Sequence, residues 1–125
     1  MRIFKSKWFN KWASKENISD QVIQEAASEV VQGLVESDLG GGLFKKRISR
    51  PGGGKSGGYR FLIGFKKDNT DRIIFIFGFS KNRFSSITEK EQEVLSLVAK
   101  SFFSSSDEQI LSMIGNKDIF EVNNE

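Results

Sequence analysis

The stretch Pro51-Gly52-Gly53-Gly54-Lys55-Ser56-Gly57-Gly58-Tyr59-Arg60 is the starting point for predicting the fold. Five of the seven residues from 52 to 58 are glycine, and glycine loses more backbone entropy than any other residue in a helix or strand interior. The segment is therefore predicted to be a loop. Apolar and aromatic residues flank it on both sides, in Leu43–Ile48 and in Tyr59–Phe65. Both flanks are predicted strands, so the glycines are expected to join two neighbouring strands.

The same region carries a concentrated positive charge. Between Leu39 and Lys67 there is no Asp or Glu, and eight residues are basic: Lys45, Lys46, Arg47, Arg50, Lys55, Arg60, Lys66 and Lys67. The formal net charge of the chain is only +3, so this block is a local positive field. A basic sheet with a basic glycine-rich loop favours a phosphate-bearing partner. The alternative is a solvated strand face beside an ordinary hairpin loop, but eight unpaired charges would repel one another there without a partner.

Two nucleotide-binding motifs match parts of the loop, and both are rejected. Gly52, Gly54 and Gly57 have the spacing G-x-G-x-x-G, but that motif needs a helix after the loop, and a strand pattern follows here. The tripeptide Gly54-Lys55-Ser56 matches the end of a Walker A loop, but the leading glycine of that motif would fall at Ser49. The loop is therefore not predicted to hold a nucleotide.

Composition limits the remaining chemistry. The chain has 125 residues, 38% of them hydrophobic and 28% charged, which indicates one globular domain over residues 1–125. It contains no Cys and no His, which removes thiolate and imidazole ligands and the usual general base at neutral pH. We therefore predict no metal site and no cofactor. The chain shows no long apolar run and no secretory leader, so we expect a cytoplasmic protein without a membrane partner.

Hydrophobic periodicity and capping signals predict an α+β fold without internal repeats. The predicted elements are, in order, helices over Phe4–Lys15 and from Asp20 to about Glu36, strands over Leu43–Ile48, Tyr59–Lys66 and Arg72–Phe79, a helix capped by Thr88 and Glu91, a short helix capped by Ser105–Glu108 and running to Ile114, and a strand over Ile119–Val122. The third strand is apolar on both faces and is therefore the predicted central strand.

Alternation along the second strand assigns its two faces. The residues Tyr59, Phe61, Ile63 and Phe65 are expected to lie under the helices, whereas Arg60, Leu62, Gly64 and Lys66 are expected to face a ligand. In the preceding strand, Lys45 and Arg47 share the more polar face, which should lie beside Arg60.

With these residues placed, the chain resembles the RelE/ParE superfamily of bacterial toxin–antitoxin toxins, and within it a RelE-like, HigB-like branch. The resemblance spans nearly the whole chain and is carried by Trp8-Phe9, Asp38–Leu43, Lys45–Arg47, Pro51-Gly52, Gly54–Arg60, Phe77–Asn82 and Ile119–Val122. It implies two N-terminal helices packed on a small curved antiparallel sheet, with C-terminal helices and a short final strand. It also implies that RNA binds the concave face opposite the two helices.

The resemblance implies a type II toxin that binds the ribosome, cleaves the messenger RNA there and arrests translation. It implies a cognate antitoxin as well, expected to be a small helix-turn-helix protein from the adjacent gene. Two alternatives remain: a ParE-like inhibitor of DNA gyrase, and a non-catalytic RNA-binding relative. ParE-type toxins generally lack a basic catalytic cluster, so the basic block favours the endoribonuclease.

Cleavage of RNA without a metal needs a base for the ribose 2′-OH, a cation for charge developing on phosphorus, and an acid for the leaving oxygen. Arg60 suits the electrostatic role, because a guanidinium grips two phosphate oxygens and never deprotonates. A lysine among other cations gives up its proton more readily, which makes Lys45 and Lys81 candidates for the base or the acid.

By the resemblance, Arg60 falls on the functional arginine of the family, Lys45 and Arg47 on its basic first strand, and Lys81 on its lysine after the central strand. The predicted catalytic residues are thus Arg60, Lys45, Arg47 and Lys81, and the predicted nucleic-acid-binding residues are Lys46, Arg50, Lys55, Arg83 and Phe84. One feature departs from the family. Many members carry a tyrosine near the start of the C-terminal helix, where this chain has Phe84, which stacks but exchanges no proton. Tyr59, the only tyrosine, is predicted to face the core.

Overall fold

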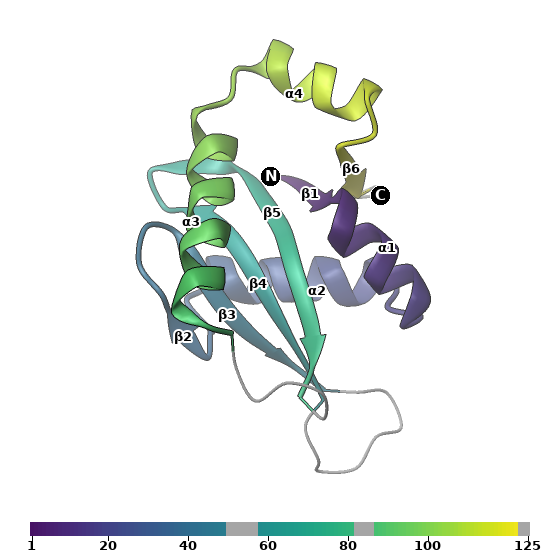
Figure 1. Ribbon diagram of the computed structural model, residues 1–125, viewed down its shortest axis with the longest axis vertical. Coiled ribbons are helices and arrows are strands. Elements are labelled where there is room, and N and C mark those ends of the chain that lie inside the picture. The colour runs from purple at the N-terminus through teal and green to yellow at the C-terminus, as the bar shows by residue number, and fades with distance from the viewer. Residues whose placement is uncertain (50–57, 82–86, 123–125) are drawn as a thin grey trace.

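The fold is a mixed six-stranded sheet with helices on both faces (Figure 1). The computed structural model describes residues 1–49, 58–81 and 87–122. The elements run in the order β1 (Arg2–Ser6), α1 (Lys7–Lys15), α2 (Asp20–Val31), β2 (Ser37–Asp38), β3 (Leu43–Ile48), β4 (Tyr59–Lys66), β5 (Asn69–Ser80), α3 (Glu89–Ser104), α4 (Asp107–Gly115) and β6 (Ile119–Val122). The predicted α+β class is confirmed. Within the described ranges, no helix is long and apolar enough to cross a membrane.

The sheet has the strand order β2-β3-β4-β5-β1-β6. Strands β3, β4 and β5 pair antiparallel, as predicted, but β1 pairs parallel with β5. The prediction of an antiparallel sheet is therefore wrong for this pair. Strand β6 then pairs antiparallel with β1, so the last strand closes the sheet next to the first.

The first element is a strand, so the predicted helix over Phe4–Lys15 is wrong at its beginning. The sheet has a hydrophobic core on each of its two faces. Ile3 and Phe4 are both buried, but Ile3 lies in one of these cores and Phe4 in the other. This alternation is that of a strand. The helix begins only at Lys7, because the Ser6 hydroxyl accepts a hydrogen bond from the backbone N–H of Phe9 at 3.0 Å and acts as the N-cap.

Helix α2 also ends earlier than predicted, at Val31 instead of near Glu36. Gly33 has a φ of 85°, which an L-residue with a side chain rarely adopts, and the chain leaves the helix there. The segment that follows reaches the sheet and forms the short strand β2 beside β3. Strand β5 is longer than predicted and begins at Asn69. The boundaries of β3, β4 and β6 and the capping box of α3 match the sequence-based predictions. The N-cap of α4 is Ser106, within the predicted capping segment Ser105–Glu108.

Helices α1 and α2 cover the first face of the sheet. The core there, which we call the first core, includes Tyr59, Phe61, Ile63 and Phe65, all at most 3% exposed, as the alternation predicts. Trp12 of α1 packs onto Gly78 of β5 so closely that a Cβ atom at this glycine would overlap the indole ring. The aromatic residues of α1 therefore fix the helix to the sheet.

Helix α3 lies across the opposite face of the sheet, and α4 lies near β6 (Figure 1). Both helices contribute to the hydrophobic core on this face, which we call the second core. Leu62 is fully buried there, and a Cβ atom on Gly64 would lie 3.2 Å from that of Ala99 in α3. The expectation that this whole face is free for a ligand is therefore wrong. Leu62 and Gly64 pack against α3 there, whereas Arg60 lies near the beginning of β4 and Lys66 at its end.

A salt bridge joins the first and last strands and makes stability depend on pH. Arg2 donates to the Glu121 carboxylate from Nε at 2.8 Å and from a terminal nitrogen at 2.9 Å. These bonds lower the pKa of Glu121 below its ordinary value of 4.5. A carboxylate with a lowered folded-state pKa stabilises the fold above its unfolded pKa, and the contribution disappears as the pH falls through the folded pKa.

We therefore expect Glu121→Gln to reduce the free energy of unfolding at pH 7 but to have less effect as the pH falls below about 4.5. Both side chains are more than a third exposed, so solvent screens the pair and the loss at neutral pH should be under about 1 kcal/mol. Denaturant unfolding at a series of pH values measures this difference. A constant difference between the variant and the wild type at every pH would contradict the lowered pKa of Glu121. The control is Glu93→Gln on α3, which removes a different carboxylate.

Candidate nucleic-acid interface

Neighbouring strands bring the predicted catalytic residues together at one end of the sheet. Arg47 of β3 lies directly opposite Arg60 of β4, and Lys45 lies two residues further along the same face of β3. Lys81 follows β5, and its backbone N–H donates to the carbonyl of Gly58, just before β4 begins. We call Lys45, Arg47, Arg60 and Lys81 the cationic cluster. The sheet register thus gathers the four residues toward the end of the sheet where β4 begins.

A carboxylate from outside the basic block pairs with two members of this cluster. Glu36 Oε2 lies 2.6 Å from Arg60 Nε, and Glu36 Oε1 lies 3.5 Å from Lys45 Nζ. The short contact to Nε is an ion pair without a well-aligned N–H···O hydrogen bond. Like charges directly opposite each other in a sheet destabilise it, so a carboxylate beside Arg47 and Arg60 reduces this repulsion. The interpretation of the basic block as unpaired charge is therefore wrong for Lys45 and Arg60.

Burial differs sharply within the cluster. The Arg60 side chain is 9% exposed and that of Lys45 is 23% exposed, whereas Arg47 and Lys81 are exposed residues. Arg60 also borders a pocket of about 580 Å³ that is lined by Gly33, Leu34, Val35, Glu36, Lys46, Arg47 and Arg60. A partly desolvated guanidinium at the wall of a pocket interacts more strongly with an anion than an exposed one does.

Lys46 lies on the other face of β3 and is not part of the cluster. Its ammonium group donates to the carbonyl of Leu34 at 2.8 Å and lies 3.1 Å from a carboxylate oxygen of Glu29 in α2. Only 12% of its side chain is exposed. The structure therefore ties Lys46 to helix α2, although sequence reasoning grouped it with the RNA-binding residues. The other predicted nucleic-acid-binding residues, Arg50, Lys55, Arg83 and Phe84, lie outside the described residues.

Tyr59 faces the helices, as predicted, and not the cationic cluster. Its hydroxyl donates to Glu16 at 3.1 Å, and its ring makes an edge-to-face contact with Trp12 at a centroid distance of 5.5 Å. The residue is 3% exposed. The only tyrosine of the chain therefore packs in the first core and does not face the cationic cluster.

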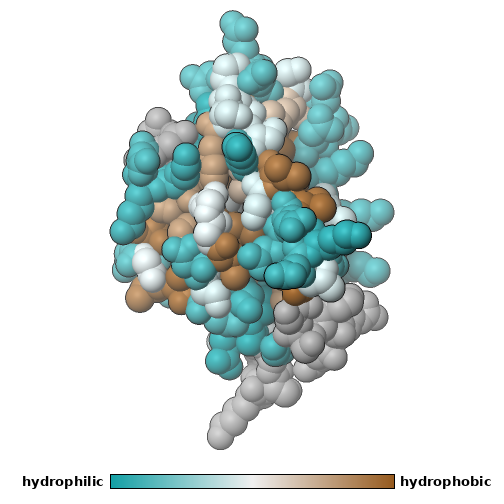
Figure 2. Space-filling view, turned by 60° about the vertical axis from the view of Figure 1, so that its left-hand side comes forward, coloured by the Kyte–Doolittle hydropathy of each residue, from teal (hydrophilic) through white to brown (hydrophobic). Residues whose placement is uncertain are grey.

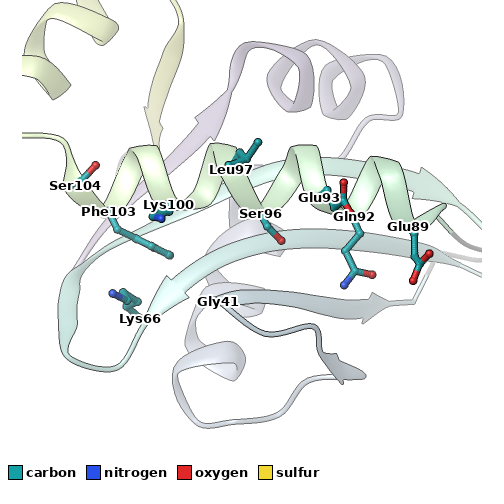
Figure 3. Close-up of a pocket in the computed structure, with 10 residues that line it drawn as sticks. All are labelled: Gly41, Lys66, Glu89, Gln92, Glu93, Ser96, Leu97, Lys100, Phe103 and Ser104. Carbon is teal, nitrogen blue, oxygen red and sulfur yellow. The ribbon is translucent and has the colours of Figure 1, made fainter.

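A second, larger pocket lies along α3, away from the cluster (Figure 3). It has a volume of about 980 Å³ and is lined by Gly41, Lys66, Glu89, Gln92, Glu93, Ser96, Leu97, Lys100, Phe103 and Ser104. Its charged residues are of both signs, and Lys66 lies over the ring of Phe103 at 5.7 Å. On the face of the molecule drawn in Figure 2, hydrophobic and hydrophilic residues are interspersed. This mixed pocket is less suited to a polyanion than the cationic cluster is.

Sequence reasoning missed Glu36, whose carboxylate pairs with Lys45 and Arg60 of the cluster. The charge count began at Leu39, three positions after Glu36, so the basic block looked free of acids. A wider window would have included both Glu36 and Asp38. The pairing itself becomes visible only in the fold, because Glu36 and Arg60 lie on segments that the strand pairing brings together. Among the described residues, no three His, Cys, Asp or Glu side chains gather into a group that could hold a metal ion.

One known protein family matches almost the whole length of this chain. A family model described as "RelE toxin of RelE / RelB toxin-antitoxin system" matches residues 1–122. A search of curated proteins finds no match to this chain. The match includes β1, both layers of helices and all the strands that carry the cationic cluster.

Proposed function

The chain belongs to the RelE toxin family, and from this premise we propose that it arrests translation by cleaving messenger RNA on the ribosome. As a toxin of a toxin–antitoxin system it has an antitoxin partner. We assign that role to a small helix-turn-helix protein from the adjacent gene. We also propose that the toxin acts in the cytoplasm, where ribosomes are. Within the family, we assign it to the HigB-like branch.

The observation that carries the proposal is the cationic cluster, in which the Arg60 side chain is largely buried. RNA cleavage by attack of the 2′-oxygen forms a new P–O bond and breaks the bond from phosphorus to the 5′-oxygen. The products are a 2′,3′-cyclic phosphate and a 5′-hydroxyl. Charge develops on the phosphoryl oxygens during this step, and a preorganised cation such as Arg60 stabilises it.

Two protons move in the same step, and lysines of the cluster are assigned to them. The base takes the proton of the 2′-hydroxyl, and the acid gives a proton to the leaving 5′-oxygen. Lys45 lies on the same face as Arg60, and Lys81 lies beside the start of β4. We assign one proton transfer to each of these two lysines and assign Arg47, which is exposed opposite Arg60, to the scissile phosphate.

The remaining predicted RNA-binding residues are assigned to affinity and not to chemistry. Arg50, Lys55 and Arg83 would contact phosphates of the message or of ribosomal RNA, and Phe84 would stack on a base. Lys46 receives no RNA contact in this proposal, since its ammonium group is held by Glu29 and the Leu34 carbonyl.

The proposal is tested by inducing the protein without its antitoxin. We expect growth and protein synthesis to stop and primer extension to reveal new 5′ ends inside translated regions of messages. The same messages should stay intact when translation initiation is blocked, because cleavage requires the ribosome. Intact messages together with gyrase-dependent DNA damage would favour the ParE-like alternative. Ribosome binding without new message ends would favour a non-catalytic relative.

A further inference from the structure

We propose that Glu36 is a positioning residue of the cleavage site, whose carboxylate holds Arg60 and Lys45 in one fixed arrangement. This inference rests on the proposed function, because it concerns the same cationic cluster. It adds an acidic residue to a site that sequence reasoning described only by its cations. Glu36 acts through the two cations and is assigned no contact with RNA.

The first support is that one carboxylate reaches cations on two strands. Oε2 of Glu36 lies 2.6 Å from Nε of Arg60 on β4, and Oε1 lies 3.5 Å from Nζ of Lys45 on β3. A carboxylate that uses both oxygens in this way restricts both side chains at once. Long cationic side chains otherwise have many rotamers, so this restriction lowers the entropy cost of arranging them for a reaction.

The second support is that Glu36 is itself held in place by the backbone. Its N–H donates to the carbonyl of Lys45 at 2.8 Å, and the next residue, Ser37, pairs with Lys45 in the β2–β3 ladder. In the preceding residue, the Val35 side chain packs against the first core. The Glu36 carboxylate is therefore attached to a fixed point at the edge of the sheet.

The third support is the electrostatic environment of Arg60. Its side chain is 9% exposed, and Arg47 lies directly opposite it on the neighbouring strand. A buried cation is stabilised by a nearby negative charge, and removing the Glu36 carboxylate takes away the one that lies 2.6 Å from Arg60 Nε. Without Glu36, repulsion from Arg47 and Lys45 would push the Arg60 guanidinium toward water. The cations would then no longer face the phosphate in the same geometry.

A competing role for Glu36 makes the opposite prediction. A carboxylate beside Arg60 also resembles a phosphate in charge, so it could block the site until RNA displaces it. Removal of a blocking carboxylate would increase both RNA affinity and cleavage. Removal of a positioning carboxylate should decrease cleavage at saturation, even though the net charge becomes more positive and long-range attraction to RNA increases.

The test compares Glu36→Gln with Glu29→Gln in ribosome-dependent cleavage. Both variants remove one negative charge and so raise the net charge by one. Glu29, however, pairs with Lys46 on the opposite face, at 3.1 Å. We expect Glu36→Gln to lower the cleavage rate on saturated ribosomes roughly 10- to 100-fold, because small misplacements of reacting groups cost about this much. The ribosome concentration for half-maximal rate should stay the same or fall. Glu29→Gln should cleave at the wild-type rate.

A double-mutant cycle shows whether Glu36 acts through Arg60. In the Arg60→Ala background, Glu36→Gln should lower the cleavage rate by a smaller factor than in the wild-type background, because only the contact of Glu36 with Lys45 is then left to lose. The conservative variant Glu36→Asp, which keeps the charge, should retain more activity than Glu36→Gln. A merely structural role would lower the melting temperature of Glu36→Gln but leave the rate of the folded fraction unchanged.

Two results would overturn the inference. Cleavage by Glu36→Gln at or above the rate of Glu29→Gln would show that the carboxylate blocks the site or plays no part in it. Additive effects of Glu36→Gln and Arg60→Ala on thermal unfolding would show that the two side chains do not interact in the folded protein. The second measurement needs no enzymatic activity. If the wild type cleaves no message, the proposed function fails, while the unfolding cycle still decides whether Glu36 positions Arg60.

Discussion

Replacing Arg60 by alanine is expected to slow message cleavage about 100-fold, because it removes a preorganised cation from the developing charge on phosphorus. Losing one such donor typically costs about 3 kcal/mol of transition-state stabilisation. The Arg60 side chain is 9% exposed at the wall of a pocket, where an electrostatic interaction is stronger than in bulk water. The folded state should survive the change, since the partner Glu36 is 29% exposed and can be hydrated.

Cleavage and ribosome binding should be measured side by side at two salt concentrations. Lys66→Ala is the matched control, because it removes one positive charge from the other end of the same strand, where Lys66 lies over Phe103. We expect it to cleave at nearly the wild-type rate. Lys55→Ala should instead weaken ribosome binding in a salt-dependent way, as the loss of a phosphate contact does, with little effect at saturation.

The outcome separates chemistry from charge. Equal losses for Arg60→Ala and Lys66→Ala would show that only the total charge of the sheet matters. An Arg60→Ala variant that binds ribosomes normally and cleaves at the wild-type rate would remove Arg60 from the site. A lysine at position 60 should restore little, because an ammonium lacks the planar fork that holds two phosphate oxygens.

The sequence was sufficient to predict the elements whose signals are local. The glycine-rich segment marks the connection between β3 and β4, the capping box at Thr88 marks the start of α3, and the capping segment Ser105–Glu108 marks the start of α4. Alternation within β4 separates the Phe61 face from the Arg60 face. Each of these signals depends on residues within a few positions of one another, so no knowledge of the fold was needed.

Predictions that depend on distant pairing were wrong or missing. Strand β1 has only five residues, and its pairing with β5 joins positions about 70 apart in the sequence, such as Ile3 and Ile73. The nearby Trp8 and Trp12 have helical spacing, which extended the predicted helix back over Phe4. Helix α3 covers Leu62 and Gly64 because of tertiary packing with Ala99, and strand alternation contains no information about a second layer.

The same limit applies to the candidate site. Sequence and family resemblance grouped the cations, and the register places Arg47 opposite Arg60. Sequence and family resemblance did not reveal that Glu36 pairs with Arg60 or that Lys46 pairs with Glu29, because both acids lie before the basic block in the sequence. Charge balance is a property of the folded surface, so a count along the chain overestimates the free positive charge.

Replacing Phe61 by alanine should reduce the free energy of unfolding by about 3 to 5 kcal/mol, the usual cost of removing a buried phenyl ring. Phe61 is fully buried and makes edge-to-face contacts with Phe9 and Phe75, at centroid distances of 5.1 and 5.8 Å. It also contacts Trp12 at 6.0 Å, so its loss leaves a cavity among three aromatic residues that join α1 to the sheet. Denaturant unfolding should show a lower midpoint with an unchanged slope.

Phe103→Ala is the control for this variant, since its ring is only partly buried at the edge of the second core and should cost less. A change of less than about 1 kcal/mol for Phe61→Ala would contradict the packing described for the first core. Phe61 and Arg60 are adjacent on β4 but point to opposite faces. Phe61→Ala should therefore lower stability while the folded fraction still cleaves, and Arg60→Ala should lower cleavage while the fold remains stable. Loss of the cleavage rate per folded molecule in Phe61→Ala would show that the first core also sets the geometry of the cationic cluster.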